Sequence, residues 1–150
     1  MIHGSCFCGG IKFEIGKVMF MRHCHCSRCR KETGAAFGTV AVVALDQFKF
    51  LKGEELVKTY HYPPNGSRAF CSVCGSKAPL QLQFQHGHIY LVYAGLLDDD
   101  PEVRPMLHMF VGSKAPWWEI NDSLPKYDKW VPGFEPPSTR RSTRRQSFSR

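Results

Sequence analysis

Two short stretches decide how this chain folds: residues 4–10 read GSCFCGG, and residues 70–76 read FCSVCGS. Each stretch places a close pair of cysteines at a glycine-containing turn, Cys6 with Cys8 and Cys71 with Cys74. The C-x2-C-Gly pattern at Cys71 and Cys74 is typical of a zinc knuckle. Cys6 and Cys8 have the less common C-x-C spacing, but a tight turn followed by two glycines can direct both sulfurs to one ion, so the two pairs fit a closed four-thiolate site. The alternative is that these are buried apolar cysteines, because cysteine also packs as a small hydrophobic residue. We expect these four cysteines to bind a structural zinc ion that joins the start of the chain to its middle.

A third cysteine cluster lies at residues 23–29, which read HCHCSRC. Its C-x-C-x2-C spacing places three sulfurs on about one turn of chain, close enough to hold one metal ion. Three protein ligands and a fourth, open position are typical of catalytic zinc sites. The sequence therefore predicts a second zinc ion with the ligands Cys24, Cys26 and Cys29.

Two alternatives remain open for this third cluster. Histidine is a common metal ligand, so a histidine could close the site as the fourth ligand; the candidates are His3, His23, His25, His61, His86, His88 and His108. Alternatively, the cluster is a set of reactive thiols without metal. In that case Cys29 would be activated by a helix N-terminus and by the neighbouring Arg28 and Arg30.

Charge indicates which chemistry an open three-thiolate site would suit. A zinc ion with three thiolates carries a net negative charge, which makes it a weaker Lewis acid than zinc held by three neutral histidines. Such a site would hold a substrate thiol as a nucleophilic thiolate more readily than it would generate hydroxide from water. Nearby cations could offset the negative charge and receive substrate carboxylates; they are Arg22, Arg28, Arg30 and Lys31.

Length and composition indicate one folded domain. The chain has 150 residues, of which 43% are hydrophobic and 22% charged, so a wholly disordered or fibrous protein is excluded. Alternating and β-branched stretches predict strands at 11–15, 18–24, 35–45, 48–53, 56–62, 79–84, 88–96 and 106–111. A short helix is expected from Ser27 to Glu32, with Ser27 as its N-cap and Gly34 as its stop. The fold class is therefore mainly β.

The positive charge is concentrated at the C-terminal end. The formal net charge is +7, and residues 136–150 contain five arginines and no acidic residue. We divide the chain into a zinc-binding β domain, 1–135, and a basic Ser/Arg-rich disordered tail, 136–150, because the tail can bury too little apolar surface to fold. The tail could contact nucleic acid through its phosphates, although a merely solubilising tail is the favoured interpretation.

The cysteines and the first residues of the chain indicate the cellular compartment. Disulfide frameworks are rare in reducing compartments, and the opening MIHGSCFCGG lacks the charged start and apolar stretch of a signal peptide. No window approaches the apolar length of a membrane span. We expect a cytoplasmic protein with reduced cysteines and without membrane contact.

Taken together, these motifs resemble the family of glutathione-dependent formaldehyde-activating enzymes and centromere protein V. The resemblance covers about residues 3–130 and follows an ordered signature: GSCFCG at 4–9, HCHCSRC at 23–29, TGAAF at 33–37, Gly53-Glu54 and FCSVCGS at 70–76. It implies a β-tent fold of small antiparallel sheets pinned by the four-cysteine zinc. It also implies that Cys24, Cys26 and Cys29 hold a second, catalytic zinc ion.

The resemblance further implies an activity, that of a carbon–sulfur lyase. The reaction is the condensation of formaldehyde with glutathione to S-(hydroxymethyl)glutathione. The chain is shorter than the formaldehyde-activating members and adds the basic tail. The alternative function is therefore a non-catalytic zinc-binding module that engages nucleic acid or a protein partner through its tail. A closed second metal site would favour this alternative.

Overall fold

The computed structural model describes residues 1–63, 66–84 and 87–133. Its strands are β1 Ile2–Ser5, β2 Lys12–Ile15, β3 Val18–Cys24, β4 Gly38–Ala44, β5 Phe48–Lys52, β6 Val57–Tyr62, β7 Gly66–Cys71, β8 Leu80–Phe84, β9 Gly87–Tyr93, β10 Pro105–Met109 and β11 Lys126–Tyr127. The α-helix is α1 Ser27–Thr33, and short 3-10 turns cover Leu45–Gln47, Glu54–Leu56, Ala94–Leu96 and Val111–Ser113.

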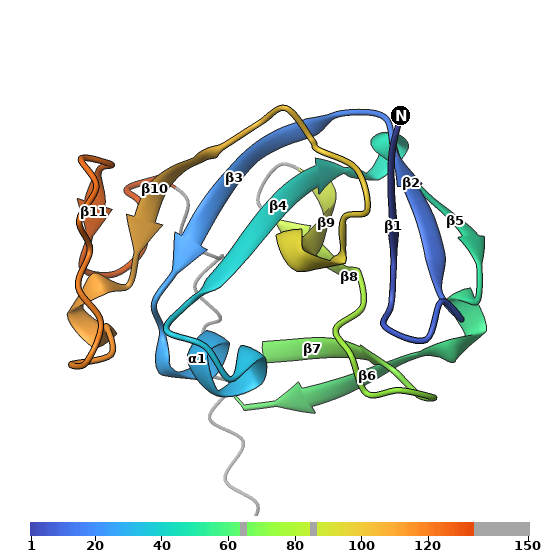
Figure 1. Cartoon of the computed structure of the whole chain (residues 1–150), viewed down its shortest axis with the longest axis horizontal. Helices are drawn as coiled ribbons and strands as arrows, with labels where there is room; N and C mark the ends of the chain where they lie inside the picture. The colour runs from blue at the N-terminus through green and yellow to red at the C-terminus, as the bar shows by residue number, and fades with distance from the viewer. Residues whose placement is uncertain (64–65, 85–86, 134–150) are drawn as a thin grey trace, which may run out of the picture.

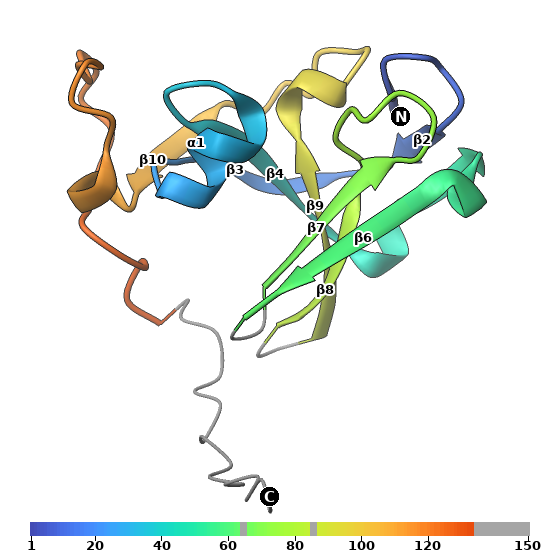
Figure 2. The ribbon, with the colours of Figure 1, turned by 90° about the horizontal axis from the view of Figure 1, so that it is seen from below.

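The described strands form three sheets (Figures 1 and 2). The largest has the order β11-β10-β3-β4-β9-β8, the second has the order β1-β2-β5, and the third is the hairpin β6-β7. Figure 1 shows α1 at the end of β3 and the start of β4, with the β6-β7 hairpin extending beside it. The helix and the hairpin therefore close one end of the large sheet, where the cysteine-bearing turns also lie.

The prediction of a mainly β fold built from small sheets is confirmed, with one difference in strand direction. β1, β2 and β5 pair antiparallel, as do β3, β4, β9 and β8. At the other edge, β10 runs parallel to both β3 and β11. The expectation of purely antiparallel pairing is therefore wrong for β10. The long connection after Leu97 returns the chain to the starting end of β3, and β10 then enters the sheet in the same direction as that strand.

The core lies between the large sheet and the β1-β2-β5 sheet. Alternation along β2 buries Phe13 and Ile15, as the period of a half-buried strand requires. The Phe48 ring stacks on the Tyr90 ring with centroids 3.9 Å apart, which joins β5 to β9 in the large sheet. Fully burying an aromatic side chain contributes about 1.5–3 kcal/mol, so contacts of this kind help to hold the two sheets together.

Two strands that position the cysteines escaped the sequence analysis. β1 pairs with β2, with Gly4 opposite Phe13; a Cβ at Gly4 would lie 2.3 Å from the Phe13 ring, so the close approach requires glycine. β7 begins with Gly66, Ser67 and Arg68, which give no strand signal, and it pairs with β6 along its whole length. β1 leads into Cys6, and β7 ends at Cys71.

The basic tail predicted at 136–150 lies outside the described residues, and the division of the chain into domain and tail stays a prediction. Within the described part of the chain, no helix has the length and apolar character needed to cross a membrane.

Candidate metal centres

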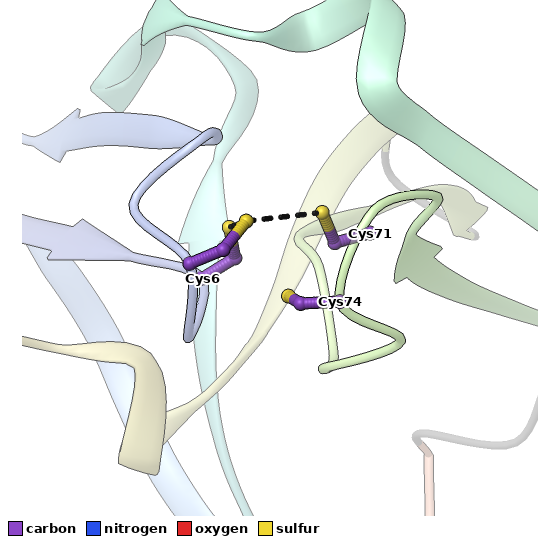
Figure 3. A group of neighbouring side chains, drawn as sticks. Cys6, Cys71 and Cys74 are labelled. Carbon is purple, nitrogen blue, oxygen red and sulfur yellow. Dashed lines mark hydrogen bonds between the residues drawn. The ribbon is translucent and has the colours of Figure 1, made fainter.

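The first cysteine cluster joins the β1–β2 turn to the end of β7 (Figure 3). The sulfurs of Cys6, Cys8, Cys71 and Cys74 all lie within 4.8 Å of one another. The Cys6 and Cys8 sulfurs are 3.5 Å apart, and those of Cys8 and Cys71 are 3.9 Å apart. A tetrahedral zinc site with Zn–S bonds of about 2.3 Å has sulfur–sulfur edges of about 3.8 Å. The donor set and its spacing therefore fit a closed four-thiolate metal site.

Two glycines give the turns of this cluster their shape. Gly9 and Gly75 have φ angles of 69° and 73°, in the left-handed region that favours glycine. Each follows a cysteine directly and donates its N–H to the carbonyl of Cys6 or Cys71, at 2.9 and 2.8 Å. The Ile11 N–H also points at the Cys6 sulfur, at 3.2 Å. The two turns thus direct their sulfurs toward each other from segments more than sixty residues apart in sequence.

The second cluster lies where β3 gives way to α1. The sulfurs of Cys24, Cys26 and Cys29 lie within 4.8 Å of one another. Cys26 is the N-cap of α1, and its sulfur accepts a hydrogen bond from the Cys29 N–H at 3.3 Å. The prediction that Ser27 caps the helix is therefore wrong, because the sulfur of the preceding residue takes the place of a hydroxyl. The predicted stop is confirmed, since Gly34 is the left-handed C-cap.

The three thiols of this second cluster do not titrate independently. Hydrogen bonds with Cys24 and Cys29 lower the pKa of Cys26 to about 2. Hydrogen bonds with Cys24 and Cys26, together with burial, raise the pKa of Cys29. Three sulfurs this close together cannot all be thiolates unless a cation balances them. Metal binding would release the remaining protons, so the cluster is chemically suited to a thiophilic divalent ion.

Within the described part of the chain, no histidine nitrogen or carboxylate joins these three sulfurs as a possible fourth ligand. The two nearest histidines in sequence have other partners. The His23 Nδ1 atom lies 2.9 Å from the Thr39 hydroxyl, and the His25 Nε2 atom lies 2.8 Å from His108 Nδ1. Closure of the site by a histidine is therefore not favoured by the side-chain positions.

Asp122, His108 and His25 form a chain of polar side chains that leads from the surface to the second cluster, because His25 lies between Cys24 and Cys26 in sequence. The half-exposed Asp122 carboxylate lies 3.0 Å from His108 Nε2, and His25 and His108 are both buried. An ionised carboxylate only accepts hydrogen bonds, so His108 donates from Nε2, and in its neutral form it accepts at Nδ1. The His25 Nε2–H then donates to His108, which leaves His25 Nδ1 unprotonated and without a hydrogen-bond partner among the described residues.

Electrostatics agree with this tautomer assignment. Burial, with the nearby His108, lowers the pKa of His25 to about 4, so its imidazole is neutral at neutral pH. Hydrogen bonds from the Leu124 N–H and from His108 lower the pKa of Asp122 and keep it an acceptor. His25 is therefore a buried neutral imidazole with one bare acceptor nitrogen beside the second cysteine cluster.

An open hollow of about 490 Å³ lies between α1, β4 and the turn that follows Cys74. Its lining includes Glu32, Phe37, Thr39, Ser76, Lys77 and Tyr93. Gly38 separates the hollow from the second cluster, since a Cβ there would lie 3.6 Å from the Cys29 Cβ and 2.7 Å from the Tyr93 ring. The hollow thus borders the turn after Cys74, and Gly38 lies between the hollow and Cys29.

Comparison with known proteins places these clusters in a family context. Residues 1–113, three quarters of the chain, match the family described as glutathione-dependent formaldehyde-activating enzyme. The chain belongs to this family. A relative from Halomonas elongata named "Putative glutathione-dependent formaldehyde-activating enzyme" is 27% identical over 129 residues, which cover 80% of this chain and 81% of that protein.

A solved structure supports the fold of this family member. The crystal structure of a Rhodobacter sphaeroides protein superposes with a TM-score of 0.51 at 23% identity, and the match covers 65% of this chain and 89% of that one. Similarity at this level shows a shared fold. The matched family segment contains all seven cysteines of the two clusters.

The cations predicted to surround the second cluster have separate surroundings. The Arg28 guanidinium lies over the Tyr62 ring, 4.5 Å from its centroid, and Arg22 Nη1 contacts the Met109 sulfur at 2.9 Å. Lys31 is exposed, whereas Arg30 Nε is buried without a hydrogen-bond partner among the described residues. Whether these four residues receive substrate carboxylates stays a prediction.

The sequence analysis missed a group of charged side chains beside the second cluster. Glu32 follows Cys29 by almost one helical turn, and Lys77 directly follows the FCSVCGS stretch at 70–76. Arg68, on β7, contacts both Glu32 and the Cys29 sulfur. The three-residue spacing from Cys29 to Glu32 was the one available signal, because the other partners come from distant strands.

Proposed function

We propose that this protein is a zinc-dependent carbon–sulfur lyase-type enzyme that forms S-(hydroxymethyl)glutathione from glutathione and formaldehyde. One observation carries the proposal: in a member of this family, three cysteine sulfurs converge while no fourth protein ligand does so within the described residues. Three ligands and an exchangeable position are typical of catalytic zinc, whereas a fourth protein ligand would close the site.

We assign Cys24, Cys26 and Cys29 to the catalytic zinc ion, and Cys6, Cys8, Cys71 and Cys74 to a structural one. When bound, the catalytic zinc would hold the substrate sulfur as a thiolate near neutral pH. The reaction joins that sulfur to the formaldehyde carbon, breaks the carbonyl π bond, and transfers the thiol proton to the new hydroxyl oxygen. Cys26, the half-buried member of the three, gives the most direct access for a small thiol.

The remaining part of the thiol substrate is assigned to the open hollow beside Gly38. The hollow is large enough for a tripeptide, and hydroxyl groups of Thr39 and Ser76 line it. Lys77 and Arg68 both contact the single carboxylate of Glu32. Because two cations share one anion, this wall suits a thiol that carries carboxylates.

We place the enzyme in the cytoplasm, because all seven cysteines are free thiols and both clusters require reduced sulfur. The basic tail lies outside the described residues, so the alternative of a module that binds nucleic acid or a protein through this tail stays a prediction. That alternative gains support only if turnover is absent.

The test is catalysis of adduct formation above the spontaneous rate. Exchange between 13C-formaldehyde and S-(hydroxymethyl)glutathione can be followed by NMR, with catalytic amounts of zinc-loaded protein. We expect acceleration by the natural chain and at least a tenfold loss in Cys26→Ala, as is typical when a metal-site residue is changed. Met106→Ala, at an exposed position on β10, should retain the full rate. Equal rates with and without the natural protein would refute the proposal.

A further inference from the structure

A half-buried ion-pair network lies against the second cysteine cluster. The Glu32 side chain is only 7% exposed and accepts from three groups: Arg68 Nε, Lys77 Nζ at 3.2 Å and the Tyr93 hydroxyl at 2.7 Å. These partners come from β7, from the turn after Cys74 and from β9. A carboxylate this far from water requires such partners. The network therefore holds α1, which carries Cys29 and is capped by Cys26, against three separate segments.

Arg68 extends this network to sulfur. Its Nη2 group donates to the Cys29 sulfur at 3.9 Å, and its Nη1 group donates to the Ser67 carbonyl at 2.8 Å. The guanidinium also lies 5.2 Å from the centroid of the Tyr62 ring. An arginine guanidinium stays protonated in proteins. The guanidinium is thus a permanent, fixed cation whose arms reach a carboxylate on one side and a thiol on the other.

The charges indicate what this contact does. A divalent ion held by three thiolates is anionic, and a substrate thiolate adds a further negative charge. Glu32 neutralises only one of its two cationic partners, so the group as a whole offsets part of this charge. A donor on a ligand sulfur also withdraws electron density from it, as outer-shell hydrogen bonds do at metal sites.

We propose that Arg68 is the positioning residue of the metal site at Cys24, Cys26 and Cys29, which it stabilises by donating to the Cys29 sulfur while Glu32 fixes its guanidinium. The inference rests on the proposed function, because it requires a metal ion at this cluster. Arg68 is then the partner of the ligand Cys29, and the ion pair with Glu32 serves to hold Arg68 in place. Lysine could supply the charge but not the two-armed donation.

Metal affinity, measured without any thiol substrate, tests this role. The full chain is loaded with cobalt(II), and the two bound ions are removed with a chelator while the thiolate–cobalt absorption is followed. In Arg68→Gln we expect one of the two ions to bind about 10-fold to 100-fold more weakly, as is typical for a lost outer-shell partner, while the other is unchanged. Arg68→Lys should show a smaller loss confined to the same ion.

Arg104→Gln is the matched control, because Arg104 also forms an ion pair, with Asp100, but is 68% exposed and contacts no cysteine. Unchanged affinities in Arg68→Gln, or an equal fall for both ions, would overturn the inference and make Arg68 a purely structural partner of Glu32. If the glutamine variant does not fold, the lysine variant decides: an unchanged affinity overturns the inference. Loss of cobalt affinity without any formaldehyde turnover in the natural chain would refute the proposed function and leave the role of Arg68 standing.

Discussion

Replacing Cys71 by alanine distinguishes a metal ligand from a packed core cysteine. The Cys71 side chain is fully buried and belongs to the hydrophobic core. If packing were its whole contribution, Cys71→Ala would cost less than Val92→Ala, which removes two methyl groups from an equally buried position. That control should cost about 2 kcal/mol. A difference between the two variants therefore measures something other than packing.

The metal interpretation predicts a far larger effect. Binding of structural zinc contributes on the order of 10 kcal/mol to the folding of zinc-finger peptides, whereas whole domains are stable by about 5–15 kcal/mol. The first cluster ties the β1–β2 turn to the end of β7, so its loss removes most of the free energy of unfolding. Cys74→Ala should cost nearly as much, although the half-buried Cys74 has less packing to lose. Cys26→Ala should cost little, because its cluster joins neighbouring residues of one turn.

The assay is urea unfolding followed by circular dichroism, with zinc content measured on the same samples. We expect Cys71→Ala and Cys74→Ala to lose one zinc ion and to be largely unfolded in the absence of urea. Cys26→Ala should lose at most the other ion and unfold near the midpoint of the natural chain. The reasoning is refuted if Cys71→Ala keeps two zinc ions and costs no more than Val92→Ala.

Three further results are expected. Elemental analysis of protein expressed with ample zinc should find two ions per chain, and one or none would contradict the assignment of both clusters. In 15N NMR spectra, His25 should be the neutral Nε2–H tautomer at pH 5.5, since burial lowers its pKa from 6.5 to about 4. Between these two pH values the unfolded chain binds a proton at His25 and the folded chain does not. The free energy of unfolding therefore falls as the pH falls from 6.5 toward 4. A protonated His25 at that pH would refute the burial argument. Deleting 136–150 removes five of the net +7 charges and leaves +2, so retention on immobilised DNA at low salt should weaken while zinc content stays the same; a full chain that is never retained would remove the nucleic-acid alternative.

The sequence by itself determined the cysteine partition and most strands. Cysteines two or three residues apart beside a glycine can direct their sulfurs to one point, and this property depends only on local chain geometry. The same holds for the strand at β2, where Phe13 and Ile15 alternate with polar residues. The helix stop at Gly34 is also local, because a residue in the left-handed region suits glycine wherever it occurs.

The tertiary structure alone decided what surrounds the clusters. Arg68 and Tyr93 meet Glu32 from strands that are distant in sequence, and Asp122 reaches His25 only through His108. No local pattern encodes such meetings, since each depends on how the sheets are placed relative to one another. The parallel entry of β10 beside β3 is of the same kind, because strand direction at a sheet edge depends on the path of the preceding connection and not on the residues of the strand. Short-range geometry thus identified the candidate metal ligands, and long-range packing supplied the charges that act on them.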